Sequence, residues 1–412
     1  MLMPFVYKIN SMNSTFNQMF SLHNRFRDLW LLLFSCLFFA ISCTNKVKEE
    51  ARIPEINLAK EIDGTAVNLS SITDSIEYIP LETTDSSFIG QVMDIKLTKD
   101  FIFVQDRILD RLLVFHRSGK FLNQIGREGK GPGEYARLFT FTTDKDGQNV
   151  YLSTTSDRVL HYTVQNSYVN TIITLCGRFN YISMIDSLFF LYMARPNRLS
   201  CDGYSYFFIN KTATVINKGH KIDIATIGKS ATVSYSSNYR YKNLECFWEV
   251  GFDTIYSLDR DFNLLPRYTL LLGNKLAEKA DLSSRTDFDQ SIRGGALTIF
   301  GIKEAGNFLY FNVVKDSRIT QLVYFKDSSK LFDIGSSNTG GFTNDIDGGP
   351  GFSPLFIGNS AYLIDVKFLD SFQESLKRQE TIPNKLNNPT SNILSQIDEN
   401  SNPVLMVIKI RE

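Results

Sequence analysis

Short runs of apolar residues dominate the chain from about residue 76 onward. The runs are rich in β-branched and aromatic side chains, and Gly, Asp, Asn and Ser separate them. Runs of this length between turn residues predict β-strands. In the stretch that ends at Gly126 the pattern predicts four strands, at about 93–97, 101–105, 111–116 and 121–125. The tight turn RSGK (117–120) joins the last two.

The same layout returns in residues 140–174. The segment DRLLVF (110–115) aligns with DRVLHY (157–162) at an offset of 47 residues. Four strands that recur at such a period predict the blades of a β-propeller. The third to sixth blades are predicted from strand-like stretches at 187–210, 246–273, 296–335, and 360–366 together with 402–410. The predicted fold class is therefore all-β, a six-bladed β-propeller.

Two stretches depart from the strand pattern and predict small helical inserts. Residues 275–294 have a helical composition, and residues 366–379 place four apolar side chains, from Phe368 to Leu376, at helical spacing. Packing of this apolar stripe against a blade is favoured over binding of a partner.

The ends of the propeller are expected to meet. A closed ring leaves no strand edge exposed. Residues 76–81 are therefore expected to pair with the last blade, beside residues 404–410.

Residues 1–42 have the features of a secretory signal peptide. Arg25 and Arg27 precede an apolar run over 29–42, which is shorter than the roughly 20 residues that a membrane-spanning helix needs. The run ends in the sequence AISC, which resembles a lipobox and predicts lipidation of Cys43. Cleavage without lipid and an uncleaved anchor are the alternatives, and Met12 and Met19 are alternative start positions.

The segment after Cys43 is polar and charged. It predicts a tether over residues 43–75 between the lipid and the folded domain. The propeller itself is expected over residues 76–412.

The loop IGREGKGPGEY (125–135) has the glycine content of a phosphate-binding loop but not its spacing. A P-loop requires Gly five positions before its Gly-Lys pair and Ser or Thr after it. Here Gln124 stands five positions before Gly129, and Gly131 follows Lys130. The glycines also miss the spacing of G-x-G-x-x-G, and no helical pattern follows. A turn between strands, with glycines at positive φ, explains the loop better.

Residues 104–135 resemble NHL-type propeller blades, whose D, R, F and G positions lead into G-x-GPGE[FY]. Most of the chain after the tether resembles the bacterial six-bladed β-propeller lipoproteins, an NHL-like or TolB-like group. The likeness is carried by YIPLETTDSSFIG (78–90), IGREGKGPGEY (125–135), DTIYSL (253–258), NDIDGG (344–349) and NPVLMVIKI (402–410). The resemblance implies an exported propeller and brings no catalytic residues with it.

Composition and motifs argue against several classes of function. The 44 basic and 44 acidic residues balance, so a nucleic-acid partner is not expected. After Cys43 the chain has only Cys176, Cys201 and Cys246, which allow one disulfide and one free thiol. The motifs C-x-x-C, H-E-x-x-H and G-x-S-x-G do not occur. No metal, cofactor or catalytic residue is therefore predicted.

Two Asp-rich stretches, 144–147 and 345–348, are fragments of a calcium-loop pattern. The full twelve-residue pattern is missing from both. Turns capped by Asp side chains explain them better than calcium binding.

Blade topology selects a set of candidate ligand-binding residues. The turn between the second and third strands and the link to the next blade emerge on the same face, where propellers bind ligands around a central channel. The candidates on this face are Arg107, Asp110, Arg111, Arg127, Lys130, Asp157 and Arg158. A solvated polar rim is the alternative for the whole set.

The sequence therefore predicts an exported, lipid-anchored binding or scaffold module of the cell envelope. It is expected on the outer membrane, facing the periplasm or the surface. Its expected partner is a small molecule, a glycan or an envelope protein. A cell-envelope hydrolase or lyase with a site at the channel mouth, and a periplasmic sensor partner, are the alternatives.

Overall fold

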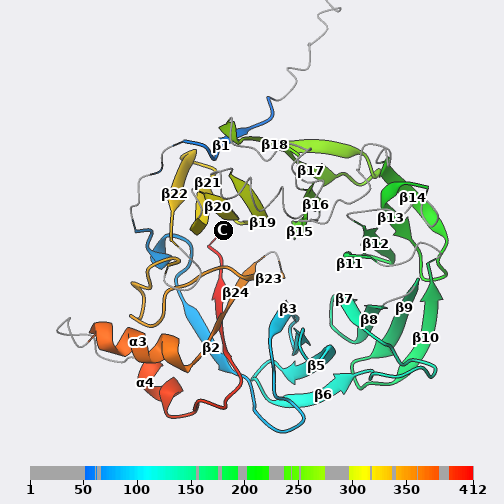
Figure 1. Cartoon of the computed structure of the whole chain (residues 1–412), viewed down its shortest axis with the longest axis horizontal. Coiled ribbons are helices and arrows are strands. Elements are labelled where there is room, and N and C mark those ends of the chain that lie inside the picture. The colour runs from blue at the N-terminus through cyan, green and yellow to red at the C-terminus, as the bar shows by residue number, and fades with distance from the viewer. Residues whose placement is uncertain are drawn as a thin grey trace, which may run out of the picture. The chain divides into compact units, whose positions relative to one another are not determined.

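The computed structural model describes residues 52–60, 62, 66–154, 157–174, 179–193, 202–221, 236–242, 244–249, 252–273, 297–315, 318–335, 340–359, 361–379 and 389–411. Residues 53–412 form one unit, in which six sheets stand around a common axis (Figure 1). The predicted six-bladed β-propeller is confirmed. Among the described residues no helix is long and apolar enough to span a membrane.

In blades 1 to 5 the strands follow one another from the axis to the rim as antiparallel neighbours. Blade 1 consists of β3 (Val92–Leu97), β4 (Phe101–Asp106), β5 (Arg111–His116) and β6 (Phe121–Ile125). Blade 2 consists of β7 (Leu138–Thr143), β8 (Asn149–Thr154), β9 (Arg158–Thr163) and β10 (Tyr168–Ile173). Blade 3 consists of β11 (Tyr181–Ile185), β12 (Leu188–Tyr192), β13 (Tyr204–Ile209) and β14 (Val215–Lys221).

The remaining blades hold both ends of the folded chain. Blade 4 consists of β15 (Ser236–Tyr241), β16 (Leu244–Glu249), β17 (Thr254–Leu258) and β18 (Leu264–Leu271), with β1 (Glu55–Asn57) at its edge. Blade 5 consists of β19 (Thr298–Ala305), β20 (Phe308–Lys315), β21 (Arg318–Phe325) and β22 (Lys330–Asp333). Blade 6 consists of β23 (Phe356–Asn359), β24 (Tyr362–Lys367), β25 (Val404–Lys409) and β2 (Ile76–Pro80).

The hydrophobic pattern explains where each strand lies in its blade. Strand β4, with the sequence FIFVQD, is buried at every position after its first, because neighbouring blades cover both of its faces. The outermost strand β10 is mostly exposed. The four strands predicted for the first blade are confirmed, and β5 and β9 begin 47 residues apart, as the repeat predicted.

Strand β2 closes the ring as predicted. It pairs antiparallel with β25, with Ile76 opposite Ile408 and Pro80 opposite Val404. Because β25 also pairs with β24, strand β2 completes the last blade.

The expected tether over residues 43–75 is too long. Strand β1 pairs parallel with β18, and both Ile56 and Leu58 are fully buried. Further along, the 3-10 helix η1 (Leu69–Ser71) docks through the Leu69 amide, which donates to the carbonyl of Thr343 at 2.8 Å. The segment from Ile53 belongs to the folded unit, because its apolar side chains pack into the propeller core.

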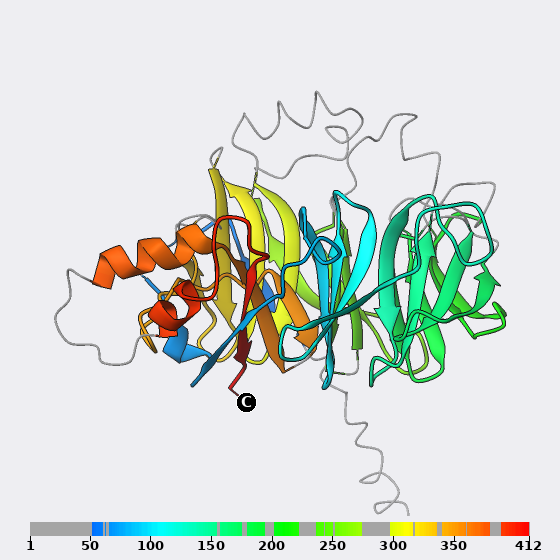
Figure 2. The same cartoon turned by 90° about the horizontal axis from the view of Figure 1, so that it is seen from below.

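Two described helices lie outside the ring beside blade 6 (Figure 2). They are α3 (Leu369–Gln379) and α4 (Pro389–Leu394). Phe372 of α3 is fully buried against Tyr78, with ring centroids 5.7 Å apart, so the predicted packing of this helix on a blade is confirmed. The helix begins later than residue 366, because β24 continues to Lys367. The insert predicted at 275–294 lies outside the described residues.

Candidate functional site

The strand order of blade 1 fixes which turns share a face of the ring. Since β3 to β6 alternate in direction, the 107–110 turn and the connection after β6 emerge at the same ends of the strands, and the 117–120 turn emerges at the other. Contacts agree with this placement. The Asp110 carboxylate accepts a hydrogen bond from the Leu138 amide at 3.1 Å and lies 4.0 Å from Nε of Arg137.

Arg111 is directed into the protein. Its guanidinium donates to the backbone carbonyls of Ser86 and Phe88, and its Nε lies 3.8 Å from the Asp106 carboxylate. That carboxylate is fully buried and accepts hydrogen bonds from four backbone amides, including those of Gly90 and Gln91. Arg111 therefore fastens the chain before β3 onto the second and third strands of its blade.

The loop that carries Arg127 and Lys130 packs on the rim of blade 2. The Tyr162 hydroxyl donates to the carbonyl of Gly133, and a Cβ at Gly133 would meet the ring of Tyr168 on the outermost strand. Arg127 forms an exposed ion pair with Glu134 at 2.7 Å within the loop. These contacts place the loop at the perimeter, whereas the sequence predicted the mouth of a central channel.

The other predicted residues do not converge with this loop. Arg107 is exposed at the start of the 107–110 turn, and Arg158 is exposed at the start of β9. The backbone carbonyl of Asp157 accepts a hydrogen bond from the Thr174 amide at 2.7 Å. Their neighbour Ser156 lies outside the described residues. The structure thus brings Asp110 to the 126–138 connection but does not gather the predicted set into one pocket.

A different group, of five charged side chains and one tyrosine, converges on the axis of the propeller. Figure 1 shows the innermost strands around this axis, among them β3, β11, β15 and β19. We call the group the axial cluster. Its members are Asp94, Lys96, Tyr181, Arg240, Glu245 and Lys303.

Lys96 reaches from blade 1 toward two other blades. Its Nζ lies 5.4 Å from the ring centroid of Phe141 in blade 2 and 5.9 Å from that of Tyr181 in blade 3. Aromatic faces attract an ammonium group at such distances. Only at the axis can a side chain of blade 1 touch the innermost strand of blade 3.

Lys303 approaches the axis from blade 5. Burial lowers the pKa of its ammonium to about 8, and the attraction of Asp94 opposes this decrease. Burial raises the pKa of Asp94, whereas Lys96 and the Ile95 amide, which donates at 2.9 Å, oppose that rise. The electrostatic contact between Asp94 and Lys303 therefore joins blades 1 and 5 across blade 6.

One side of the axial cluster is saturated with hydrogen bonds. Glu245 is 2% exposed, accepts from Ser183 Oγ at 2.9 Å and lies 3.9 Å from Nε of Arg240. Burial raises the pKa of Glu245. Arg240 also donates to the carbonyl of Met184 at 3.1 Å.

The two lysines differ from this saturated pair. Among the residues that the structure describes, neither Lys96 nor Lys303 has a hydrogen bond to its ammonium group or an ion pair within 4.0 Å. Both side chains keep partial exposure although protein surrounds them. The axial cluster thus presents two unpaired cations and one nearby carboxylate, Asp94.

Sequence reasoning missed this cluster. Asp94 and Lys96 stand at alternating positions inside an apolar strand, and Lys303 stands inside another. A charged residue within the innermost strand of a blade is a usable signal of an axial site, because charged side chains that face solvent are expected on the outer strands. The pattern alone cannot say which such charges meet.

The structure also describes several of the metal-ligating and thiol groups that the sequence offered as candidates. Within the described part of the chain no three His, Cys, Asp or Glu side chains are grouped to hold a metal. Asp345 accepts from the amide and hydroxyl of Ser70, and Asp144 accepts from Asn149, so both Asp-rich stretches use carboxylates to fix turns. Cys246 is a buried free thiol whose pKa burial raises to about 12. Cys176 and Cys201 lie outside the described residues.

Comparison with known proteins gives a family and a fold. A family model described as a domain of unknown function, DUF4934, matches residues 53–409. No curated protein matches the chain. A protein of Bacteroides fragilis NCTC 9343 that is predicted to be exported is similar in structure, with a TM-score of 0.66 at 18% identity, covering 87% of this chain and 99% of that one. A DUF4221 member from Bacteroides vulgatus ATCC 8482 reaches 0.51 at 12% identity, covering 85% and 99%. At these identities the likeness shows the fold alone.

Proposed function

The chain belongs to the DUF4934 family, and we propose that it is an exported binding module that holds a small anion at the propeller axis. The observation that carries the proposal is the pair Lys96 and Lys303, whose ammonium groups both act on Asp94 and have no ion-pair partner within 4.0 Å among the described residues. Charges taken out of water oppose folding unless they are paired. Two such charges at one place become favourable when a ligand of opposite charge binds to them.

The charge balance of the axial cluster indicates the class of ligand. Arg240 and Glu245 face each other, which leaves two ammonium groups and the single carboxylate of Asp94. Because burial raises the pKa of Asp94, its negative charge is the weaker part of the balance. A carboxylate or phosphate anion would supply the missing charge and accept charge-assisted hydrogen bonds from both lysines.

Export and anchoring form the second part of the proposal. The apolar run over 29–42, which Cys43 follows directly, supports a lipoprotein signal. The Bacteroides fragilis protein of similar fold, itself predicted to be exported, supports the same location. Lipidation of Cys43 would hold the propeller at the cell envelope, where stable anchoring takes more than one acyl chain.

Anion binding is tested by thermal unfolding with inorganic phosphate and succinate as probes, against chloride at equal ionic strength. A ligand that binds only the folded state raises the melting temperature with concentration. The rise should disappear in the double variant Lys96→Met, Lys303→Met and persist in Lys145→Met, an exposed lysine of blade 2. If phosphate and succinate stabilise no more than chloride, or stabilise the double variant equally, the axis is not an anion site.

Anchoring is tested separately by membrane fractionation. A Cys43→Ala variant should leave the membrane fraction for the soluble one. Retention of the variant after salt and carbonate washes would show an uncleaved anchor instead.

A further inference from the structure

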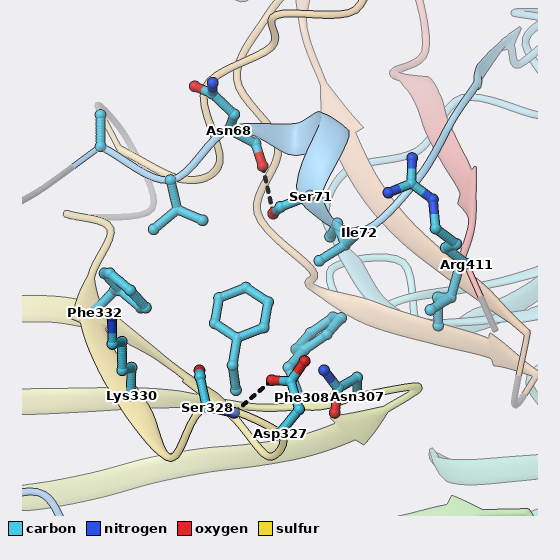
Figure 3. A pocket seen from close by; sticks show the side chains of 14 residues that line it. Asn68, Ser71, Ile72, Asn307, Phe308, Asp327, Ser328, Lys330, Phe332 and Arg411 are labelled. Carbon is cyan, nitrogen blue, oxygen red and sulfur yellow. Dashed lines mark hydrogen bonds between the residues drawn. The ribbon is translucent and has the colours of Figure 1, made fainter.

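A hollow lies on the ring where the outer part of blade 5 meets the seam with blade 6 (Figure 3). Its volume is about 500 Å³, within the range of small-molecule sites. Three parts of the chain line it, namely residues 66–72, the blade 5 stretches at 307–308 and 325–332, and the C-terminal pair Ile410 and Arg411. None of its lining residues belongs to the axial cluster. We call it the seam pocket.

The floor of the seam pocket is aromatic. The ring of Phe325 lies 6.1 Å from that of Phe308 and 5.8 Å from that of Phe332, measured between centroids. Phe308 is buried, whereas Phe325 and Phe332 keep part of their surface exposed. The pocket therefore offers flat apolar surface to a ligand with an apolar face.

The charges at the rim are largely compensated within the protein. Asp327 accepts a hydrogen bond from the Ser328 amide at 2.7 Å and from the side chain of Asn307. These bonds hold the pKa of Asp327 below its usual value, so the group stays anionic. Arg411 forms an ion pair with Asp74. A charged ligand in the pocket would therefore lie near a side chain of the same charge as well as one of opposite charge.

Two polar side chains that line the pocket have no partner in the described part of the chain. Figure 3 shows Lys330 beside Phe332 and Asn68 on the opposite wall, with the Asn68 amide directed away from the rings. Among the described residues neither the Asn68 amide nor the Lys330 ammonium has a hydrogen-bond partner for its side chain. On the side of the aromatic floor, the Lys330 ammonium donates only, and the Asn307 side chain, whose nitrogen donates to Asp327, has a carbonyl oxygen that accepts. The complement is a group that can accept and donate at once, as a hydroxyl does.

From this lining we infer that the seam pocket binds an uncharged sugar ring. The apolar C–H face of the ring would pack on Phe325 and Phe332, and its hydroxyls would bond to Asn307 and Lys330. A purely apolar ligand would bury these polar groups without partners, which costs affinity. An aromatic carboxylate would bring its charge next to Asp327.

Binding in the seam pocket would also fasten the ring. The pocket takes walls from the segments that flank β2 and β25, and the Arg411 amide donates to the carbonyl of Ile72 at 2.8 Å between these two segments. A ligand that contacts both walls stabilises the closed form over any form in which the seam opens.

The experiment is saturation-transfer NMR on the propeller with three probe pools. One pool holds neutral mono- and disaccharides, the second holds benzoate and naphthoate, and the third holds benzene and toluene. Transfer should occur to the sugar pool and not to the other two. Transfer to the aromatic carboxylates, transfer to the hydrocarbons, or no transfer to any pool overturns the inference.

Variants locate the site. For the sugar with the largest transfer, Phe332→Ala and Asn307→Ala should each weaken binding about tenfold or more. Lys145→Gln and Gln148→Ala, exposed side chains in the corresponding turn of blade 2, should leave it unchanged. Asn307→Ala keeps the aromatic floor, so it reports on binding even if Phe332→Ala folds poorly. Equal affinity in Asn307→Ala and in the parent protein would place the sugar elsewhere and refute the seam pocket.

Discussion

Replacing Gly133 by Ala should destabilise the propeller, whereas the same change two positions earlier should not. Gly133 has φ of +77°, and an added Cβ would lie 2.8 Å from ring carbons of Tyr168 and 3.0 Å from the Tyr162 hydroxyl. Gly131 lacks a positive φ, and its Cβ would approach only the carboxylate end of Glu134, at 3.0 Å. The two glycines thus form a matched pair within one loop.

The expected magnitudes follow from these geometries. A non-glycine residue in the left-handed region costs about 1–2 kcal/mol. Displacing the tyrosines also strains the buried hydrogen bond from Tyr162 to the Gly133 carbonyl, worth about 1 kcal/mol. Gly133→Ala should therefore lower the free energy of unfolding by about 2–3 kcal/mol. Gly131→Ala should stay within about 1 kcal/mol of zero, because the lost flexibility of the unfolded chain offsets a small steric cost.

The assay is thermal unfolding followed by circular dichroism. The unfolding entropy, about 2.1 cal/mol/K per residue, makes 1 kcal/mol worth about 1.3 °C in a unit of this size. Gly133→Ala should lose about 3–4 °C and Gly131→Ala about 1 °C or less. Lys130→Ala, which removes an exposed side chain, is the control that should not change the midpoint. Equal losses at Gly131 and Gly133 would refute the assignment of strain to the loop backbone.

Three further perturbations probe closure and buried charge. Deleting residues 402–412 removes β25, the partner of both β2 and β24, and should lower the melting midpoint of the whole unit; an unchanged midpoint would contradict closure by β2. Glu304→Gln should cost about 3–5 kcal/mol in urea unfolding, because the buried carboxylate pairs with Arg267 at 2.6 Å and Lys326 at 2.7 Å. Since these partners lower the pKa of Glu304, its contribution is present above the unfolded pKa and lost as pH falls, so the variant should show a flatter acid limb. Lys303→Met should stabilise the protein at pH 7, and the gain should shrink as pH rises from about 8 toward the unfolded pKa near 10.5; a gain that does not depend on pH would mean that folding does not shift the pKa of Lys303.

The fold could be predicted from the sequence because its signals are local. Each strand of blade 1 is a short apolar run between turn residues, and the 47-residue offset repeats that layout in blade 2. The pairing of β2 with β25 followed from one global argument, that a closed ring leaves no edge. Strand β1 escaped prediction because three residues with one buried side chain, Ile56, carry too little pattern to separate a strand from a tether.

The candidate site could not be predicted in the same way. Arg111 was expected to face a ligand because it begins a strand at a turn, but its partners are backbone carbonyls at Ser86 and Phe88, which no side-chain pattern marks. Conversely, Lys96 and Lys303 are separated by about half of the chain, and only the circular order of the blades brings them together.

Because the circular order of the blades brings the axial lysines together, closure of the ring and binding of an anion at the axis are linked. Blade 6 stands between blades 1 and 5, and it is built from both ends of the folded chain. The contact between Asp94 and Lys303 therefore spans the blade that β2 completes by pairing with β25. An anion held between Lys96 and Lys303 would bind the closed ring and not an open one, so it should oppose opening at a seam that it does not touch. Hydrogen exchange tests this coupling: phosphate at saturating concentration should slow exchange of the amides that pair β2 with β25. Unchanged exchange at these amides, with the anion bound, would separate the axial site from ring closure.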